Sequence, residues 1–295
     1  MKILFSELPK YPWWQNGIPF YENNLAMKVA MELNYIPDQT IVFKEHTECL
    51  GVLKRNVNLS IKSFPAELDA NALNKHDAIF VRDSFISNQQ GTMVVSNFSE
   101  KERLPEASAM KQYLLQEKYT VYSLSDNAYA EGGEFYYVLQ DDLLFAGVSR
   151  NNKLGIQETA KLLEIQNVFI VESDCFHLDT LFTTLLDKKG YLCGIIACLE
   201  LIKNREELKI FAEKRHIPLI TIEQIDSIGY DGKGKISVNC LPVPGILIGG
   251  NNFITPGVEE RIKSLGINHV VSPVTQSLYS GGGVHCLTNE LTYTV

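Results

Sequence analysis

Short runs of apolar, β-branched and aromatic residues recur along the whole chain and are typical of β-strands. These runs cover residues 2–5, 40–43, 78–81, 92–95, 120–122, 135–138, 143–146, 168–171, 191–196, 218–222, 245–248 and 269–271. Other segments place apolar residues at helical spacing, and we expect helices at residues 23–33, 105–116, 154–165, 205–216 and 256–265. The last of these helices should end at Gly266, a residue suited to the helix C-terminus.

The proportion of strands to helices favours a repeated unit. Predicted strands outnumber predicted helices by about two to one, whereas a doubly wound parallel sheet has nearly equal numbers. Five helices in 295 residues give about 59 residues per unit (295/5), which is within the repeat sizes of solenoids, propellers and arrays. No linker rich in Gly, Pro or Ser divides the chain, so we expect a single domain over residues 1–295.

Composition and charge exclude several classes of protein. The formal net charge of −8 argues against nucleic-acid binding, which needs a basic surface. No stretch reaches the ~18 apolar residues of a membrane helix, and we do not expect the first residues, whose apolar run is short and soon broken, to act as a signal peptide. The six cysteines are dispersed and contain no CxxC pair, so we expect neither a disulfide framework nor a zinc ribbon, and the cytoplasm is the expected location.

Four polar segments carry candidate chemistry, and each lies at the end of a strand-like run. They are Phe80-Val81-Arg82-Asp83, Glu131-Gly132-Gly133-Glu134, Cys175-Phe176-His177-Leu178-Asp179-Thr180 and Ser280-Gly281-Gly282-Gly283-Val284-His285-Cys286. Taken singly, each also has a structural interpretation. These are an aspartate that starts a turn, a hairpin turn at two glycines, a histidine satisfied by its neighbours, and a flexible glycine loop.

The last two segments suggest a nucleophile and an acid/base partner. Three consecutive glycines are costly in chain entropy, and we expect them where the backbone passes close to a ligand and presents the Cys286 thiol. A cysteine with a distant histidine is a candidate pair for nucleophilic catalysis, and His177 beside a carboxylate can act as a general acid or base. His285 should face away from Cys286, because adjacent residues of an extended chain point to opposite sides. In an extended segment Cys175, His177 and Asp179 would share a face, which leaves a metal site open, although such close-set ligands suit a tetrahedral cage poorly.

In this order, the four segments resemble the motifs of the guanidino-group-modifying superfamily. Its members include arginine deiminase, agmatine deiminase, dimethylarginine dimethylaminohydrolase and the amidinotransferases. The resemblance spans about residues 80–288, and the N-terminal 75 residues add little to it. It implies an α/β fold, a five-bladed α/β propeller of ββαβ units (a pentein), which agrees with the order of predicted elements. Each blade would then deliver one or two groups to a central channel.

The resemblance also implies a role for each motif residue. Cys286 would attack the guanidinium carbon and form a covalent amidino thioether, and His177 would protonate the departing amine and then activate the incoming nucleophile. Asp83 and Asp179 would bind guanidinium N–H groups, since charge-assisted pairs fix both position and orientation. Glu131 would either orient His177 or accept a further N–H. The resemblance implies neither a cofactor nor a metal.

Two features bear on the branch and on the substrate. An acid two residues after the histidine, Asp179, favours the deiminase and amidinotransferase branches over the dimethylarginine dimethylaminohydrolases. Members often carry a Gly-x-Ser-x-Arg-Thr segment whose arginine binds the substrate carboxylate. Here the segment is Gly147-Val148-Ser149-Arg150-Asn151-Asn152, with its arginine one place early. Arg150 is therefore the candidate for this role, and free arginine, peptidyl-arginine and other guanidino compounds all stay open as substrates.

The sequence therefore predicts a hydrolase of the deiminase type that acts on a C–N bond of an arginine-like small molecule. An amidinotransferase, which passes the amidino group to an amine, shares the motifs and stays open as the alternative. A non-catalytic binding protein is the alternative of another class, and the complete set of Cys, His and acidic residues argues against it. The aromatic loop at residues 9–17, which contains Trp13 and Trp14, is either a lid or packing at a blade edge.

Overall fold

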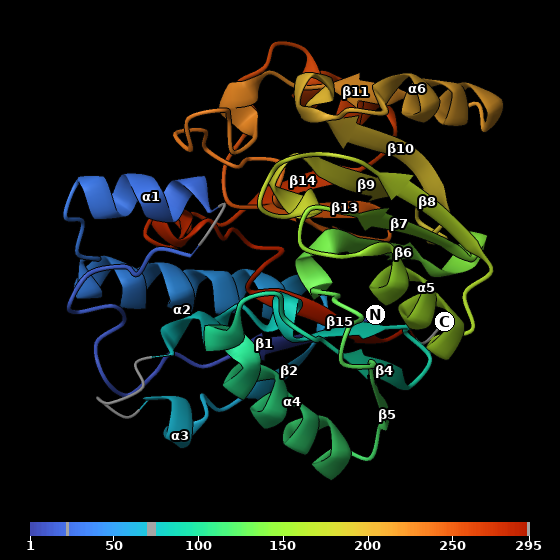
Figure 1. Cartoon of the computed structure of the whole chain (residues 1–295). Helices are drawn as coiled ribbons and strands as arrows, with labels where there is room; N and C mark the ends of the chain where they lie inside the picture. Colours follow the sequence, from blue (N-terminus) through green and yellow to red (C-terminus); the bar gives the residue numbers. More distant parts are fainter. Residues whose placement is uncertain (22–23, 70–74, 294–295) are drawn as a thin grey trace.

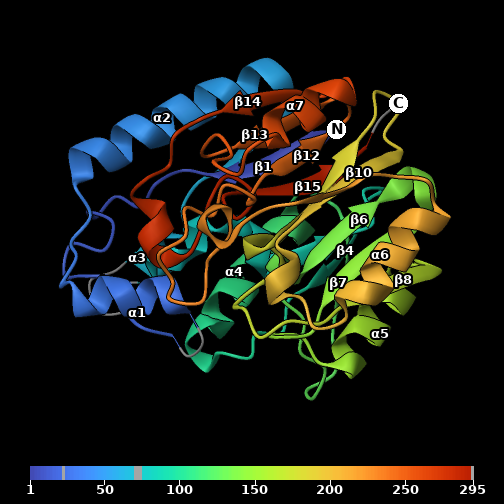
Figure 2. The same ribbon diagram turned by 90° about the horizontal axis from the view of Figure 1, so that it is seen from above.

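The computed structural model describes residues 1–21, 24–69 and 75–293. Within these residues, fifteen strands form five separate three-stranded sheets. Figure 1 shows the sheets arranged about the middle of the molecule, and Figure 2 shows α2, α5, α6 and α7 outside them. The five-bladed α/β propeller predicted from the sequence is confirmed.

Four of the five blades in the described chain share one connectivity. In each, two antiparallel strands are followed by a helix and by a third strand parallel to the second. The elements are β3 (Phe85–Ser87), β4 (Thr92–Val95), α4 (Leu104–Gln116), β5 (Thr120–Ser123); β6 (Phe135–Val138), β7 (Leu143–Gly147), α5 (Lys153–Leu162), β8 (Asn167–Val171); β9 (Phe182–Leu186), β10 (Leu192–Ala197), α6 (Arg205–Lys214), β11 (Leu219–Thr221); and β12 (Leu241–Val243), β13 (Ile246–Gly249), α7 (Val258–Ser264), β14 (Asn268–Val271). This is the expected ββαβ unit.

The remaining blade joins the two ends of the chain. β1 (Lys2–Ser6) lies between β15 (Thr288–Thr292), its antiparallel neighbour, and β2 (Asn58–Lys62), its parallel neighbour. In Figure 1 the dark blue β1 and the red β15 lie side by side. The helices α1 (Leu25–Glu32) and α2 (Gln39–Asn56) belong to the connection between β1 and β2. The pairing with β1 therefore fixes the segment that carries Cys286 just before β15.

Two of the predicted strands are wrong. Residues 40–43 lie in α2, which begins where the side chain of Asp38 accepts hydrogen bonds from the backbone N–H groups of Thr40 and Ile41. Residues 78–81 lie across two short 3₁₀ helices, His76–Ile79 and Val81–Ser84. The predicted helices match α1, α4, α5, α6 and α7, although Asn23, the first residue of the prediction for α1, lies outside the described residues. Gly266 has the positive φ of +73° expected just beyond a helix C-terminus.

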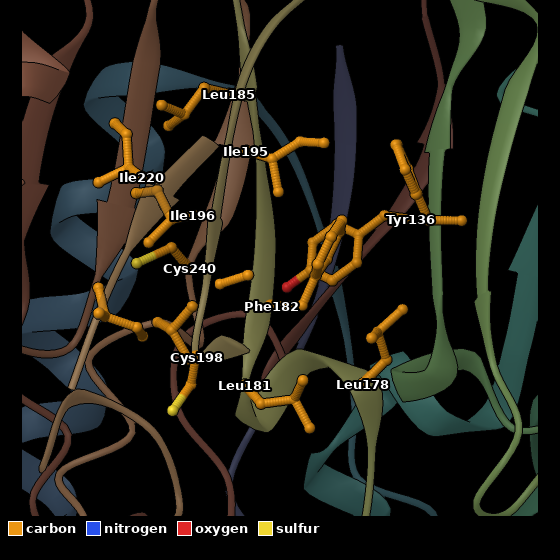
Figure 3. Packing of buried hydrophobic residues seen from close by; sticks show 14 of the residues in the cluster. Tyr136, Leu178, Leu181, Phe182, Leu185, Ile195, Ile196, Cys198, Ile220 and Cys240 are labelled. Carbon is orange, nitrogen blue, oxygen red and sulfur yellow. The ribbon is translucent and has the colours of Figure 1, made fainter. Parts of the chain in front are cut away.

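The largest cluster of buried apolar side chains spans the blades that contain β6, β9 and β12. Figure 3 shows part of it, with Tyr136 beside Phe182 and with Cys198 and Cys240 among isoleucines and leucines. The rings of Tyr136 and Phe182 lie 5.7 Å apart. Cys198 is fully buried and Cys193 packs at the edge of the cluster, as expected for cysteines that act as small apolar side chains. In the part of the chain that the structure describes, helices long and apolar enough to cross a membrane are absent.

Candidate active site

In each of the five blades of the described chain, a tight turn precedes one of the two antiparallel strands. This is the first strand in four blades and β15 in the blade that joins the chain ends. These turns carry the polar residues of the candidate site, namely Asp83 before β3, Glu131 before β6, His177 and Asp179 before β9, Asn239 before β12 and Cys286 before β15. Hydrogen bonds and ion pairs link these side chains across the blades. The structure thus brings together the sequence-predicted residues Asp83, Glu131, His177, Asp179 and Cys286, and it adds Asn239.

The Cys286 thiol is buried and lies between two polar partners. Its Sγ is 3.2 Å from Oδ2 of Asp179 and 3.1 Å from Nδ2 of Asn239. Burial raises the pKa of the Cys286 thiol well above its usual value, and the charges of Asp179 and Asp83 add to this effect. The thiol is therefore protonated at neutral pH in the absence of a ligand. A cation bound beside these carboxylates would cancel their effect and favour the thiolate.

His177 is held by two carboxylates. Its Nε2 lies 2.9 Å from Oε2 of Glu131, and its Nδ1 lies 3.5 Å from Oδ1 of Asp83. Burial opposes protonation of the ring, but the charges of Asp83 and Glu131 and the hydrogen bond to Glu131 outweigh it and raise the pKa of His177 to about 9. At neutral pH His177 therefore carries a proton that it can donate.

Glu131 uses both of its oxygens within the protein. Oε2 binds His177, and Oε1 accepts hydrogen bonds from the backbone N–H (3.0 Å) and the hydroxyl (2.8 Å) of Ser99. Burial would raise the pKa of Glu131, but the hydrogen bond and charge of His177 lower it to about 2. Of the two roles predicted for Glu131, this geometry favours orientation of His177 over contact with substrate.

Asp83 and Asp179 each use one carboxylate oxygen, Oδ2, for hydrogen bonds within the protein. Oδ2 of Asp83 accepts a hydrogen bond from Arg103 Nη1 at 2.8 Å, and Oδ2 of Asp179 accepts from the Cys286 thiol and, at 2.8 Å, from His285 Nδ1. Oδ1 of each carboxylate is buried and makes no hydrogen bond within the described residues. Burial raises the pKa of Asp179 to about 7, against the opposing charge of His177. Both Oδ1 atoms therefore lack a hydrogen-bond donor, although that of Asp83 also lies 3.5 Å from Nδ1 of His177.

Three further residues of the site were not predicted from the sequence. Asp77 is buried and lines the same small pocket as Asp83, Arg103 and the Cys286 thiol. Burial raises the pKa of Asp77 to about 7, although the charge of Arg103 opposes this. Arg103 pairs with Asp83 and, at 2.8 Å, with Glu106. An acidic residue directly before an apolar run was the available signal for Asp77, whereas Arg103 and Glu106 look like an ordinary start of a helix.

Arg150 lies outside this pocket. Its Nη1 is 2.8 Å from Oε1 of Glu100 and 3.1 Å from Oγ of Ser99, and its Cζ lies 4.5 Å from the centre of the Phe176 ring. Phe176 borders both the pocket at Cys286 and a second, polar cleft that Arg150 lines. Arg150 is thus linked to Glu131 through the hydroxyl of Ser99 but does not line the pocket at Cys286, and its role in substrate binding stays a prediction.

The extended conformation assumed for residues 175–179 is wrong. Leu178–Thr180 form a 3₁₀ helix, so the side chains of Cys175, His177 and Asp179 do not share a face. Cys175 belongs to the apolar cluster, whereas His177 contacts Glu131 and Asp179 contacts Cys286. In the described residues, groups of three or more His, Cys, Asp or Glu side chains placed to hold a metal are absent. The site is an arrangement of a thiol, a histidine and carboxylates.

Gly133 explains part of the Glu-Gly-Gly-Glu motif. A Cβ at this position would lie 2.6 Å from Nδ1 of His177 and 2.7 Å from Oδ1 of Asp83. Any side chain would therefore displace one of these two groups. The backbone of Gly133 therefore passes close to two residues of the site.

The aromatic loop near the N-terminus is packed into the protein. Trp13 and Trp14 are each 2% exposed. Trp13 Nε1 donates to the backbone carbonyl of His76 at 3.1 Å, and the Trp14 backbone N–H donates to Nδ1 of His76 at 2.9 Å. The Trp13 ring also meets Phe80 edge-on at 6.4 Å. Of the two interpretations of this loop, the contacts favour packing over a lid.

The five blades, with a cysteine, a histidine and acidic residues delivered from the ends of different blades, define a protein of the guanidino-group-modifying (pentein) superfamily. Within it, the family model described as "N,N dimethylarginine dimethylhydrolase, eukaryotic" matches residues 21–293, and the chain belongs to this family. This is the branch from which Asp179 was expected to separate the chain, so an acid at this position does not exclude a match to that family.

Curated relatives match part of the chain. The bifunctional arginine dihydrolase/ornithine cyclodeaminase ArgZ of Synechocystis sp. is 28% identical over 205 residues, which are 68% of this chain and 27% of ArgZ. The bifunctional enzyme AgrE of Nostoc sp. matches with the same identity and coverage. The matched segment thus spans about a quarter of these longer relatives.

Solved structures show the same fold. The N-terminal domain of ArgZ bound to its substrate superposes with a TM-score of 0.80 at 20% identity, covering 99% of this chain and 98% of that domain. A dimethylarginine dimethylaminohydrolase in adduct with S-methyl-L-thiocitrulline gives a TM-score of 0.72 at 17% identity, covering 97% of this chain and 98% of the other. At these identities the similarity shows the fold.

Proposed function

We propose that the protein hydrolyses a C–N bond in the guanidinium group of an arginine-like small molecule through a covalent intermediate on Cys286. The observation that carries the proposal is the pair of buried Oδ1 atoms of Asp83 and Asp179, which accept no hydrogen bond in the described site. A guanidinium is a planar cation with several N–H donors, and such donors pair strongly with carboxylates. Both carboxylates belong to the group of side chains around the Cys286 thiol.

Binding of the cation prepares the nucleophile. The positive charge offsets Asp83 and Asp179, the two carboxylates that raise the pKa of the Cys286 thiol. The thiol then releases its proton to solvent more easily as the substrate binds, and takes one back when the product leaves. The thiolate is the reactive form. The carboxylates also hold the guanidinium carbon in place, which converts the attack into an intramolecular step.

The first half-reaction forms a C–S bond and breaks a C–N bond. The Cys286 thiolate adds to the guanidinium carbon, and the tetrahedral intermediate expels one amine. That amine takes the proton that His177 carries at neutral pH. An amidino thioether on Cys286 and a neutral His177 remain.

The second half-reaction regenerates the thiolate. Neutral His177, held by Glu131, takes a proton from water as the oxygen adds to the amidino carbon. The C–S bond then breaks, the sulfur leaves as thiolate, and the product is a ureido compound. His177 ends the cycle protonated, as it began.

The relatives indicate which substrates to test first. The N-terminal domain of ArgZ is described as an arginine dihydrolase, and its structures include complexes with substrate, product and a covalent reaction intermediate. The dimethylarginine dimethylaminohydrolase was solved as an adduct with a thiocitrulline. These descriptions support a small guanidino compound as the substrate, with arginine and methylated arginines as the first candidates.

A product screen tests the proposal. The purified protein is incubated separately with arginine, methylarginines, agmatine, guanidino acids and an arginine-containing peptide. Ammonia, methylamines and ureido products are then measured by mass spectrometry. We expect one class to give a ureido product, and the Cys286→Ser variant to give none. A folded wild-type protein that releases no amine from any of these compounds would contradict the proposal.

A further inference from the structure

The blade that contains β12 contributes Asn239 to the site. Asp83, Asn239 and Cys286 each lie two residues before the strand that follows the turn in their blade, at β3, β12 and β15. Asn239 thus has the same place in its repeat unit as the predicted nucleophile and a predicted substrate ligand. The other two residues at this position are a carboxylate and a thiol, so an amide in the third calls for an explanation.

The Asn239 side chain is fully buried and makes four hydrogen bonds. Its Oδ1 accepts from the backbone N–H of Gly283 at 3.1 Å and of Cys286 at 3.2 Å. Its Nδ2 donates to the backbone carbonyl of Asp179 at 3.1 Å and to Sγ of Cys286 at 3.1 Å. The amide therefore binds the loop that carries the nucleophile, the sulfur itself, and the neighbouring turn that carries Asp179.

The third glycine of the motif before Cys286 fits this arrangement. A Cβ at Gly283 would lie 2.8 Å from Oδ1 of Asn239, closer than side-chain contacts allow. Gly282 is packed in the same way against the ring of Phe80, where a Cβ would lie 2.3 Å from a ring carbon. The glycines were expected to pass close to a ligand, and in the structure they pass close to protein side chains.

We infer that Asn239 is a positioning residue for the nucleophile: its carbonyl oxygen holds the Cys286 loop, and its N–H group donates to Sγ and stabilises the thiolate. The inference rests on the proposed function only in taking Cys286 as the nucleophile. An amide suits this role because it donates a hydrogen bond to a charged acceptor without titrating itself.

The charged groups around Cys286 show why a neutral donor matters. Burial, Asp179 and Asp83 all disfavour the thiolate in the free protein. His177, Arg103 and Asp77 also line the pocket, and His285 binds the same oxygen of Asp179 as the thiol does. Since the amide of Asn239 has no charge to lose, it remains a donor to sulfur while the neighbouring groups titrate.

The Asn239→Asp variant separates the two parts of this role. Aspartate keeps an oxygen for the two backbone N–H groups, but it removes the donor to Sγ and places a carboxylate beside the sulfur. We measure the rate at which iodoacetamide alkylates Cys286 between pH 6 and 10 without substrate, by quantitative peptide mass spectrometry. We expect the apparent pKa to rise by at least one unit, which slows alkylation at pH 7 by about tenfold. With substrate, kcat should fall and KM should change little.

The same samples contain an internal reference, and the chain offers a matched control. Cys193 is a half-buried thiol on β10, and its alkylation should not change in the variant. Asn204 likewise accepts from a backbone N–H, that of Glu172 at 2.9 Å, and donates to a backbone carbonyl, that of Ile170 at 2.9 Å. Asn204→Asp should therefore leave the alkylation profile of Cys286 as in the wild type.

Two additional measurements guard against misfolding. Serine is smaller than asparagine and uncharged, and the Asn239→Ser variant should also be alkylated more slowly at Cys286 at pH 7. A cooperative thermal transition of this variant shows that it is folded. In the unsubstituted protein, the NMR signals of the Asn239 side-chain amide should move as the Cys286 thiol titrates. If the chemical shifts of the Asn239 amide do not change as the thiol titrates, the inference is overturned, whatever the variants show.

The outcomes distinguish this inference from the proposed function. A folded Asn239→Asp protein whose Cys286 is alkylated with the wild-type pH profile would overturn the positioning role, even if guanidino compounds are hydrolysed. A wild-type protein that hydrolyses none of them, but whose Cys286 reactivity depends on Asn239, would support the positioning role and remove the proposed function.

Discussion

His285 donates a hydrogen bond through Nδ1 to Oδ2 of Asp179, the oxygen that also accepts the Cys286 thiol. Burial lowers the pKa of His285 well below its usual value, so the ring is a neutral donor. The ring of His285 also stacks on that of Tyr136, with ring centres 4.4 Å apart and an angle of 14° between the ring planes. His285 was expected to face away from the site, but the chain turns at residues 284–287, and both neighbours reach one carboxylate. This contact leaves Oδ1 of Asp179 open for a substrate.

The two cysteines of the motif segments should differ sharply in function. Cys286→Ser should lower kcat/KM by about a thousandfold or more, because serine is a poor nucleophile at its ordinary pKa. Cys175→Ser should keep most of the activity. Burial raises the pKa of Cys175 to about 12, and its neighbours are apolar side chains and Cys198. Steady-state kinetics with the best guanidino substrate decide this, and an inactive Cys175→Ser protein would show that the nucleophile is assigned wrongly.

Asp83 and Asp179 should determine affinity for the cationic group. In a Cys286→Ala background, Asp83→Asn or Asp179→Asn should weaken binding by at least about tenfold, the cost of one charge-assisted hydrogen bond. His177→Ala should bind substrate with little loss, since its expected role is proton transfer. Isothermal titration calorimetry measures all three. Unchanged affinity in both aspartate variants would remove these two residues from the binding site.

Stability should fall as the pH rises from acidic to alkaline values. Burial raises the pKa of Asp77 and of Asp179 to about 7. The folded state therefore binds more protons than the unfolded state above about pH 4, and stability decreases up to about pH 7. His177 acts in the same direction. The pKa of His177 is raised to about 9 despite burial, because Asp83 and Glu131 outweigh it. Its contribution is complete below about pH 6.5 and is lost as the pH rises through 9.

The Asp77→Asn variant tests this linkage. Removing the buried carboxylate should stabilise the protein at pH 8 by an amount on the order of 1 kcal/mol, or about 2–4 °C in Tm for a chain of this size. The gain should vanish near pH 4, where Asp77 is protonated in both states. Asp126→Asn is the matched control, because Asp126 is exposed. Scanning calorimetry across this pH range measures the effect, and a stability curve that rises from pH 5 to pH 8 would contradict it.

The residues found from the sequence are those that stand in recognisable motifs. Asp83, Glu131, His177, Asp179 and Cys286 could be predicted because each lies in a short polar segment at a strand end. Asn239 could not, since it is a single polar residue whose role depends on neighbours far away in the sequence. Asp77 had only a weak local signal, an acidic residue directly before an apolar run. Asn239 contacts Cys286 across 47 positions, and no local pattern marks such a contact.

The errors in the fold have similar physical causes. Residues 40–43 have the composition of a strand, but Ile41 and Phe43 are exposed on α2, and the side chain of Asp38 caps this helix. The run at residues 78–81 is buried, so its apolar composition holds, yet the chain must turn there to place Asp83. The three-residue strands β3 and β12 are too short for periodicity to reveal. At residues 78–81 the sequence thus predicted burial but not backbone conformation, and at residues 40–43 it predicted neither.

Water, and not an amine, should resolve the covalent intermediate. Cys286 is 3% exposed, and the side chains that line its pocket include Asp77, Asp83 and His177. These groups suit the activation of one small nucleophile after the first amine has left. The protein is incubated in ¹⁸O water with its best guanidino substrate and without added amine. We expect one ¹⁸O atom in the ureido product and no labelled product from Cys286→Ser. Turnover that requires glycine, ornithine or another amine, without label in any product, would instead show an amidinotransferase with the same nucleophile.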